Sequence, residues 1–353
     1  MMKKEMIYLD RNENHYGPAP AVFKALHKRN FKKLTTYSRD YTRGVKSKLS
    51  ERLSQMLDID EKQILLGYGA EDLLKQAVHC FLQAGETILV PQYSWWYYKV
   101  IADEVGGIRK IYPIIEDDHQ FRYDIEALIE AYKAHNPSMV LISTPNNPTG
   151  NSMPLADLVK VLEAMPEAVI VLDEAYTLFA NPDTSYLKML IERFPNVLIT
   201  RTFSKFYALA GIRIGYALLG KQLSELNSFS ARYLGYNRLS ERLAIAALDS
   251  TEYYEEMRRK MLADLEMFFV ELNKLSGFRA YRSETNFILC RIPEKLKNPL
   301  DAYLKSHGFV IKFMNEDELN SHVRITIGTQ EENRQLMDLI NSFMEETRNG
   351  ELV

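Results

Sequence analysis

Short apolar runs recur along the first two thirds of the chain and predict the strands of a buried sheet. The runs are nearly continuous in apolar residues, which is typical of strands covered on both faces. Stretches with helical spacing separate them, and the clearest, Ala70–Leu82, places its apolar residues on one face. Strands that alternate with helices predict an α/β fold with a mixed, mostly parallel sheet between helices. The predicted strands are Thr87–Pro91, Met139–Ser143, Ala168–Asp173, Val197–Arg201 and Ile214–Leu218.

The last third of the chain has a different pattern. A long, charged, helical stretch from Glu241 to about Ser276 precedes three shorter strand-like pieces, Asn286–Ile292, Phe309–Phe313 and Val323–Ile327. This order predicts a second, smaller α+β domain. The first 30 or so residues have no evident place in the large sheet and are expected to join the smaller unit. We therefore predict a large domain over residues 35–245 and a small domain formed by residues 1–34 and 246–353.

Composition and charge exclude several classes of protein. The 353 residues include 44 basic and 47 acidic ones, so the formal charge of −3 argues against a nucleic-acid partner. No window approaches the roughly 20 apolar residues that a membrane helix needs, and the N-terminal segment lacks the apolar stretch of a signal peptide. The two cysteines form no CxxC pair and the seven histidines show no HxxxH spacing. We predict a soluble, cytoplasmic protein with no metal site and no membrane partner.

Polar residues follow three of the predicted strands. In open α/β sheets ligands bind beyond the carboxyl ends of the strands. The polar segments there are Thr144–Gly150, Asp173–Tyr176 and Thr202–Lys205, with Arg213 eight residues past the lysine. Each alone has an ordinary explanation, such as a turn, a helix cap, a solvated lysine or a surface ion pair. Their co-occurrence at successive strand ends predicts one site.

These residue types are the ones that a pyridoxal phosphate site needs. Lys205 offers an amine that can condense with the cofactor aldehyde and later move protons. Asp173 offers a carboxylate that keeps the pyridine nitrogen protonated, so that the ring can accept electrons. Asn147 and Tyr176 offer hydrogen-bond donors to the ring oxygen. We predict Lys205, Asp173 and Tyr176 as catalytic residues.

The cofactor phosphate needs hydroxyls, a cation and the amides of a helix N-terminus. The segment Gly67–Asp72 opens the predicted helix and presents bare amides to a phosphate. It contains GxG but lacks the last glycine of GxGxxG, so a nicotinamide dehydrogenase is disfavoured. A plain helix start is the alternative for this segment. The candidate phosphate ligands are Gly69, Ala70, Glu71, Thr202, Ser204 and Arg213.

Taken together, the three polar segments and Arg213 resemble the aspartate-aminotransferase superfamily, the fold type I enzymes that use pyridoxal phosphate. Within it, Leu9–Asn14 with Tyr16-Gly17-Pro18, and Val323–Thr329, are similar to histidinol-phosphate aminotransferases. The resemblance extends from about Leu9 to Asn333 and implies a fold type I transferase.

The resemblance also implies roles for further residues. Tyr93 matches an aromatic residue stacked on the cofactor ring, although an aromatic side chain at a strand end can equally belong to the core. Tyr37 matches a tyrosine that reaches the phosphate of the neighbouring subunit's cofactor, which implies a homodimer with shared sites. A buried structural tyrosine is the alternative for Tyr37.

Substrate residues follow from the same resemblance. Arg324 matches an arginine for an anionic substrate group, unless it serves a structural ion pair. Tyr16 and Asn286 match positions that line the substrate side. Lys312 stands where the histidinol-phosphate branch has an arginine linked with phosphate recognition, and lysine loses the bidentate geometry.

Two more positions depart from the pattern of the branch. His15 stands where a proline is expected. The run Tyr93–Tyr98 is unusually aromatic, and Trp96 replaces a tyrosine. For Trp95 and Trp96 two explanations remain open, local core packing and a reshaped substrate pocket.

The function implied is that of a pyridoxal phosphate-dependent transaminase, in the first place histidinol-phosphate:2-oxoglutarate aminotransferase of histidine biosynthesis. An aminotransferase for an aromatic or other amino acid, and a phospho-amino-acid decarboxylase on the same fold, are the alternatives. A non-catalytic role is disfavoured because both Lys205 and Asp173 are present.

Overall fold

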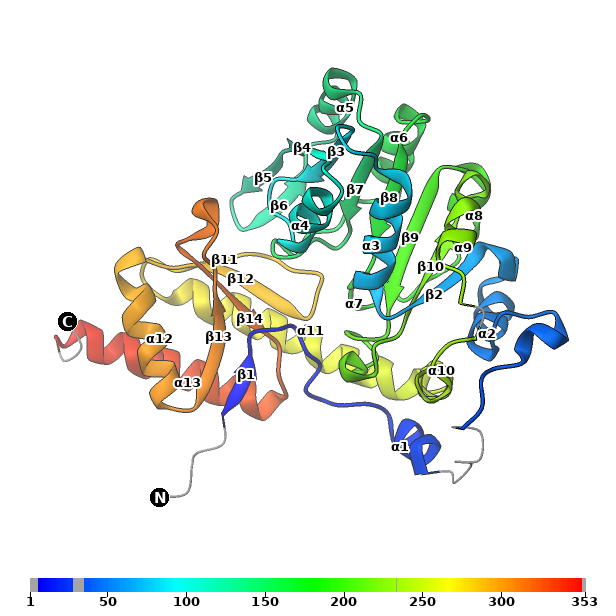
Figure 1. Ribbon diagram of the computed structural model, residues 1–353. Helices are drawn as coiled ribbons and strands as arrows, with labels where there is room; N and C mark the ends of the chain where they lie inside the picture. Colours follow the sequence, from blue (N-terminus) through cyan, green and yellow to red (C-terminus); the bar gives the residue numbers. More distant parts are fainter. Residues whose placement is uncertain (1–5, 28–34, 233, 351–353) are drawn as a thin grey trace.

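A seven-stranded sheet forms the centre of the larger part of the molecule (Figure 1). The computed structural model describes residues 6–27, 35–232 and 234–350. Five neighbouring strands are parallel, while β10 runs antiparallel to both of its neighbours, so the predicted mixed, mostly parallel sheet is confirmed. The strands, in their order across the sheet, are β2 (Ile64–Gly67), β10 (Gly215–Leu219), β9 (Val197–Thr202), β8 (Val169–Asp173), β7 (Met139–Ser143), β3 (Thr87–Pro91) and β4 (Ile108–Tyr112).

Helices cover both faces of this sheet, which explains why its strands are continuously apolar. In β7, Leu141 packs into the apolar cluster on one face, and Val140 and Ile142 into the cluster on the other. Both clusters are buried, so successive side chains are apolar rather than alternating with polar ones. The first face is covered by α3 (Ala70–Phe81), α4 (Tyr97–Glu104) and α9 (Glu225–Phe229), and the second by α5 (Ile125–His135), α6 (Leu155–Ala164) and α8 (Tyr186–Arg193).

A second sheet collects strands from both ends of the chain. Its β1 pairs in parallel with β13, so the N-terminal segment joins the smaller unit, as expected. Figure 1 shows the long helices α11 and α13 beside this sheet. The predicted domain limits remain predictions, and the one at residue 245 falls inside α10 (Arg238–Leu248). The elements are β1 (Ile7–Leu9), β13 (Phe309–Phe313), β14 (His322–Thr326), β12 (Phe287–Arg291) and β11 (Arg279–Ala280), with α11 (Thr251–Lys274), α12 (Lys297–Ser306) and α13 (Gln330–Arg348).

Some elements differ from the sequence-based expectation. The long helical stretch is two helices, because α10 ends at Leu248 and α11 begins after Ser250. The edge strand β4 has no continuous apolar run, since its Ile108 and Ile111 are about half exposed and flank two charged residues. Other elements were also not predicted. They are the strands β1, β2 and β11, the short hairpin of β5 (Ile114–Asp117) and β6 (Gln120–Tyr123), and the helices α1 (Pro20–His27), α2 (Lys48–Leu57) and α7 (Thr177–Ala180).

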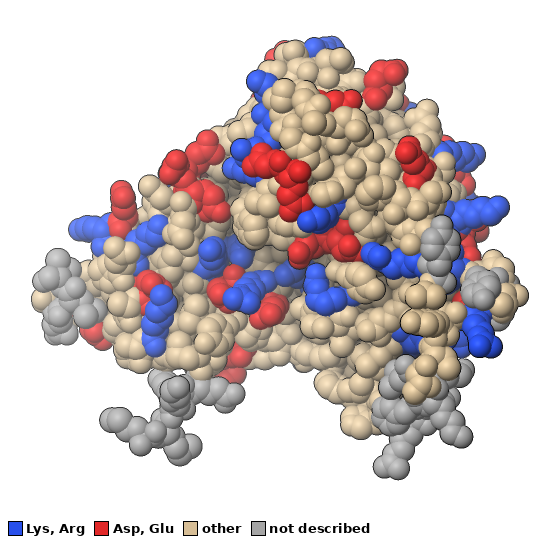
Figure 2. Space-filling model, in the orientation of Figure 1, with Lys and Arg blue, Asp and Glu red and all other residues tan. Residues whose placement is uncertain are grey.

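Charges of both signs are interspersed over the face drawn in Figure 2, in keeping with the formal charge of −3. No helix in the described part of the chain combines the length and the apolar character that a bilayer crossing needs.

His15, the residue at the expected proline position, ties the N-terminal segment to α13. Its Nδ1 lies 3.0 Å from a carboxylate oxygen of Glu332, and its Nε2 lies 3.1 Å from the carbonyl oxygen of Tyr8. Glu332 also accepts a hydrogen bond of 2.7 Å from the backbone of Thr329, in the capping box that begins α13. The hydrogen bond with Glu332 raises the pKa of His15 above 6.5 against the opposing effect of burial.

The His15→Gln variant is expected to lose stability in a pH-dependent way. Because the folded-state pKa of His15 is raised, the stabilisation is fully present below about pH 6.5 and is lost as the pH rises through the folded pKa. Just below pH 6.5, we expect the variant to lower the free energy of unfolding by about 1–2 kcal/mol. At a pH above the folded-state pKa of His15, the loss should be much smaller. Urea denaturation at one pH on each side measures this difference. Equal losses at both would mean that the charged pair contributes nothing.

Candidate active site

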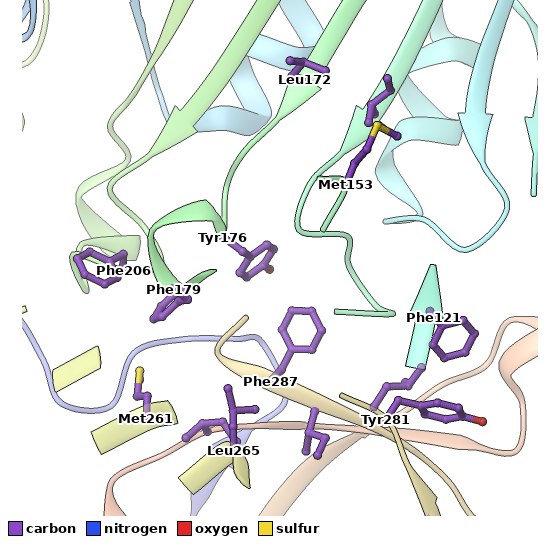
Figure 3. Packing of buried hydrophobic residues seen from close by; sticks show 14 of the residues in the cluster. Phe121, Met153, Leu172, Tyr176, Phe179, Phe206, Met261, Leu265, Tyr281 and Phe287 are labelled. Atoms are coloured by element: carbon purple, nitrogen blue, oxygen red, sulfur yellow. The ribbon is translucent and has the colours of Figure 1, made fainter. Parts of the chain in front are cut away.

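The polar segments predicted from the sequence meet at one edge of the large sheet. β7, β8 and β9 are parallel neighbours, with Ser143 opposite Asp173 and Asp173 opposite Thr200. The small domain faces this edge. Figure 3 shows Tyr176, just beyond β8, pointing toward Phe287 of β12, and their rings meet edge to face at 5.3 Å. The edge therefore lies between the two sheets.

Asp173 is buried at this edge and is held by donors from two sides. The hydroxyl of Tyr98 donates to its Oδ2 at 2.6 Å, and the backbone amide of Ala175 donates to its Oδ1 at 3.1 Å. Burial raises the pKa of Asp173, while these two hydrogen bonds act in the opposite direction. Tyr98 was not among the predicted site residues. The unusual aromatic run contained it, but its position against Asp173 depends on how α4 packs on the sheet.

Lys205 follows β9 and extends toward the N-terminal segment. Its Nζ donates to the carbonyl oxygen of Arg11 at 2.9 Å and lies 5.9 Å from the ring centre of Tyr176. Burial lowers the pKa of Lys205 to about 8, and the charge of Arg324 acts in the same direction. At pH 7 about one tenth of the amine is therefore neutral, far more than for an ordinary lysine, and a nucleophile and a base both require the neutral form.

Arg324 joins the small domain to the polar edge of the large sheet. From β14 its Nη1 donates to Oδ1 of Asn147 at 2.6 Å, and its Nη2 donates to the carbonyl oxygen of Asp10 at 2.8 Å. Nearby, Nδ2 of Asn12 donates to the hydroxyl of Tyr176 at 2.9 Å. These bonds hold three predicted site residues, Arg324, Asn147 and Tyr176. They also involve Asn12, which lies in the segment Leu9–Asn14 but was not predicted as a site residue.

Asn286 is fully buried beside this group. Its Nδ2 donates to the carbonyl oxygen of Asn12 at 3.0 Å, while its Oδ1 and the Nε of Arg324 have no partner among the residues that the structure describes. Buried polar atoms are rarely left unpaired, so these two atoms indicate a place where a ligand completes the hydrogen bonding.

Tyr16 lies differently from the other predicted substrate residues. Burial and the nearby carboxylate of Asp264 raise the pKa of Tyr16 to about 12. Asp264 belongs to α11 of the small domain. The predicted contact of Tyr16 with substrate stays a prediction.

The phosphate ligands predicted from the sequence converge at the start of α3. Gly69 is the N-cap residue of this helix and has no side chain to cap it. No cap hydrogen bond therefore occupies the first backbone amides, those of Ala70 and Glu71. The hydroxyls of Thr202 and Ser204 lie 2.9 Å apart. Nη2 of Arg213 donates to the carbonyl oxygen of Tyr68 at 3.1 Å and lies 3.5 Å from the Glu71 carboxylate. Amides, hydroxyls and a guanidinium together fit a dianionic phosphate.

Lys312 stands directly opposite Arg324 in the β13–β14 pair. Residues opposite each other in an antiparallel pair share one face of the sheet. Two cationic residues are therefore neighbours on the same face, and one of them reaches Asn147.

The aromatic candidates divide into packed and exposed ones. Tyr93 packs its ring edge-on against Phe121 at 5.5 Å, and its stacking on a cofactor stays a prediction. Trp95 packs against Tyr97 at a centroid distance of 5.0 Å, in line with local core packing, but Trp96 is 58% exposed and is not part of the core. Tyr37 is 69% exposed, so it is not buried within its own chain.

Comparisons with known proteins identify the family and the fold. The family described as aminotransferase class I and II matches residues 4–340. The histidinol-phosphate aminotransferase of Ruminiclostridium cellulolyticum is 33% identical over 82% of this chain and 80% of its own length. The solved histidinol-phosphate aminotransferase of Sinorhizobium meliloti, in complex with pyridoxal-5'-phosphate, superimposes with a TM-score of 0.86 at 26% identity, over 98% of this chain and 92% of that one. The L-threonine-O-3-phosphate decarboxylase of Porphyromonas gingivalis, with a TM-score of 0.81 at 21% identity over 96% of this chain and 100% of that one, shares the fold.

Proposed function

Since this chain belongs to the aminotransferase class I and II family, we propose that it transfers the amino group of histidinol phosphate to 2-oxoglutarate in histidine biosynthesis. The membership confirms the predicted resemblance, the fold type I architecture and the enzyme class, a transaminase that uses pyridoxal phosphate. An amino donor and a keto acid are accordingly its substrates. Histidinol phosphate as the donor, and 2-oxoglutarate as the acceptor, are the parts that we propose.

The residues of the site fit the cofactor. When bound, pyridoxal phosphate supplies an electron-accepting ring that stabilises negative charge on the substrate carbon. The amides that begin α3, the two hydroxyls beside them and Arg213 would hold the phosphate. Asp173 would keep the ring nitrogen protonated, and Asn147 and Tyr176 would donate to the ring oxygen. Lys205 would bind the aldehyde carbon and carry a proton to and from the substrate.

One observation carries the choice of substrate: the neighbouring cations Arg324 and Lys312 on one face of the small sheet. Histidinol phosphate carries a phosphate and no carboxylate, so its recognition depends on cations that meet a dianion. A guanidinium provides paired donors, and an ammonium adds a second charge without a fixed geometry. The relative from Ruminiclostridium supports the same donor by its name and by its 33% identity.

A titration of the holoenzyme with single amino donors tests this function. Absorbance of the bound cofactor reports the amino-transfer half-reaction for histidinol phosphate, phenylalanine, histidine and glutamate. We expect a fast change with histidinol phosphate, a change with glutamate as the reverse donor, and little with the other two. A fast change with phenylalanine or histidine and none with histidinol phosphate would overturn the proposal and point to a repurposed pocket.

The Gly69→Ala variant is expected to bind the cofactor at least about tenfold more weakly. Gly69 has φ +87° and ψ 174°, a conformation in which a side chain costs about 1–3 kcal/mol. A Cβ there would also lie 2.9 Å from Nη2 of Arg213, a phosphate ligand. Titration of the apoprotein with pyridoxal phosphate measures the dissociation constant.

The matched control for Gly69→Ala is Gly85→Ala. Gly85 has φ +84°, and a Cβ there would meet nothing within 4 Å. This control also places a side chain at a positive φ, but away from the phosphate ligands, so its affinity for the cofactor should equal that of the wild type. Equal affinities in all three proteins would contradict the phosphate site.

The enzyme acts as a homodimer in the cytoplasm in this proposal. Large apolar side chains that are exposed in one chain gather near the start of α3: Tyr37 is 69% exposed, Tyr68 46% and Leu234 58%. The backbone amide of Ser38 donates to the carbonyl oxygen of Leu234 at 3.3 Å, which places these segments together. A second copy that covers them would bring its own Tyr37 toward this phosphate site.

Cys80 and Cys290 are free thiols, in keeping with a reducing compartment. Light scattering of the purified protein tests the dimer.

A further inference from the structure

Among the site residues that the structure describes, only Tyr98 comes from α4. It is neither one of the predicted site residues nor one of the residues at the phosphate site. It is 1% exposed and lies in the first turn of the helix. Its ring packs edge-on against Trp95 at 5.8 Å, within the apolar cluster that covers one face of the large sheet. The ring is thus fixed by packing, and its hydroxyl is the polar end of an otherwise apolar environment.

The hydroxyl of Tyr98 points to Asp173. The distance of 2.6 Å to Oδ2 is short and is typical of an O–H group that donates to a carboxylate. Asp173 is 5% exposed, so little water competes for this oxygen. The other oxygen, Oδ1, accepts from the amide of Ala175 at 3.1 Å and lies 3.5 Å from the hydroxyl of Thr200. A carboxylate offers about four lone-pair sites, so acceptor capacity remains for a ring N–H.

We propose that Tyr98 is a positioning residue whose hydroxyl keeps the carboxylate of Asp173 ionised and oriented, so that the ring nitrogen of the bound cofactor stays protonated. This inference rests on the cofactor of the proposed function and is independent of which amine is the donor.

The physical reason is the balance between burial and hydrogen bonding at Asp173. Burial raises the pKa of this carboxyl, and donation from Tyr98 opposes that effect more than any other neighbour does. Without the donor, the buried carboxylate becomes a stronger base. A low-dielectric site then favours a neutral pair, with the shared proton on Asp173 instead of on the ring nitrogen. A ring without positive charge accepts electrons less well, and removal of the proton from the substrate carbon becomes slower.

The Tyr98→Phe variant tests this role because it removes only the hydroxyl. Tyr112→Phe is the matched control, since Tyr112 is also fully buried and its hydroxyl donates at 3.0 Å to the carbonyl oxygen of Leu141, away from the carboxylate. Both holoenzymes are loaded with pyridoxal phosphate that carries ¹⁵N in the ring. The ¹⁵N resonance reports the protonation of the ring nitrogen directly, in the absence of any amino donor.

We expect the Tyr98→Phe resonance to shift toward that of neutral pyridine, while Tyr112→Phe keeps the wild-type position. The amino-transfer rate with glutamate should fall about tenfold in Tyr98→Phe, with little change in KM. An unchanged resonance in Tyr98→Phe, or the same shift in both variants, would overturn the inference. So would a neutral ring nitrogen in the wild-type holoenzyme, and this measurement does not depend on the folding of any variant.

These outcomes are separate from a failure of the proposed function. A different amino donor would leave the ¹⁵N result untouched, because no donor is present in that measurement. A wild-type protein that binds no pyridoxal phosphate would overturn the cofactor itself.

Discussion

The Lys205→Ala variant loses amino transfer by at least about 10⁴-fold while keeping its fold. Lys205 is the amine that the site supplies, and its lowered pKa of about 8 gives it a larger neutral fraction than an ordinary lysine has. Because the same amine binds the cofactor and moves the proton, no neighbouring group can replace both roles. Within the described part of the chain, the Nζ makes a single hydrogen bond, of 2.9 Å to the carbonyl oxygen of Arg11, so its removal should cost little stability.

The measurement combines turnover with chemical trapping. Borohydride reduction followed by peptide mass spectrometry should find the cofactor attached to Lys205 in the wild type and to no residue in the variant. Lys160→Ala serves as the control, because Lys160 pairs with Glu126 at the surface and should keep full activity and labelling. Normal turnover by Lys205→Ala would contradict the assignment of the site.

The Arg201→Met variant is expected to lose about 3–5 kcal/mol of unfolding free energy. Arg201 and Glu174 form an ion pair of 2.7 Å whose side chains are only 4% and 2% exposed. Tyr186 donates to the second carboxylate oxygen of Glu174 at 2.8 Å, so the group is satisfied as a unit. Removal of the guanidinium leaves a charged or newly protonated carboxyl group buried without its partner, directly after Asp173 in the chain.

Urea denaturation measures this loss against two comparisons. Arg193→Met breaks the surface pair with Glu163, whose side chains are about half exposed, and should cost less than about 1 kcal/mol. The double variant Arg201→Met with Glu174→Gln should regain part of the lost stability because no unpaired charge remains. A loss in Arg201→Met as small as that in Arg193→Met would contradict the account of this pair.

The sequence was sufficient for residues whose chemistry lies next to a strand end. Asp173 ends β8, and Asn147 and Lys205 come shortly after β7 and β9. Parallel strands bring such ends to one edge of a sheet. Most of the core strands were predicted for the same reason, since burial on both faces produces a simple apolar pattern, but the short buried strand β2 was missed. The exposed edge strand β4 was missed because packing on one side alone leaves a mixed pattern.

Other parts of the site depend on contacts between distant segments. Asn12 reaches Tyr176 across 164 positions, and Tyr98 reaches Asp173 across 75. Neither contact follows from local spacing, because it depends on how the N-terminal segment and α4 pack against the sheet. Tyr16 matched a family position, and its contact with substrate stays a prediction. The roles proposed for the site residues are predictions that the variants above test.

The most direct test of the proposed function compares histidinol phosphate with histidinol as amino donors to 2-oxoglutarate. Glutamate formation at a series of donor concentrations gives kcat/KM for each. If Arg324 and Lys312 recognise the phosphate, loss of that group removes two charge-assisted interactions, and kcat/KM should be at least about 100-fold lower for histidinol. Equal values for the two donors, or no glutamate from either, would contradict the claim that this enzyme is built for histidinol phosphate.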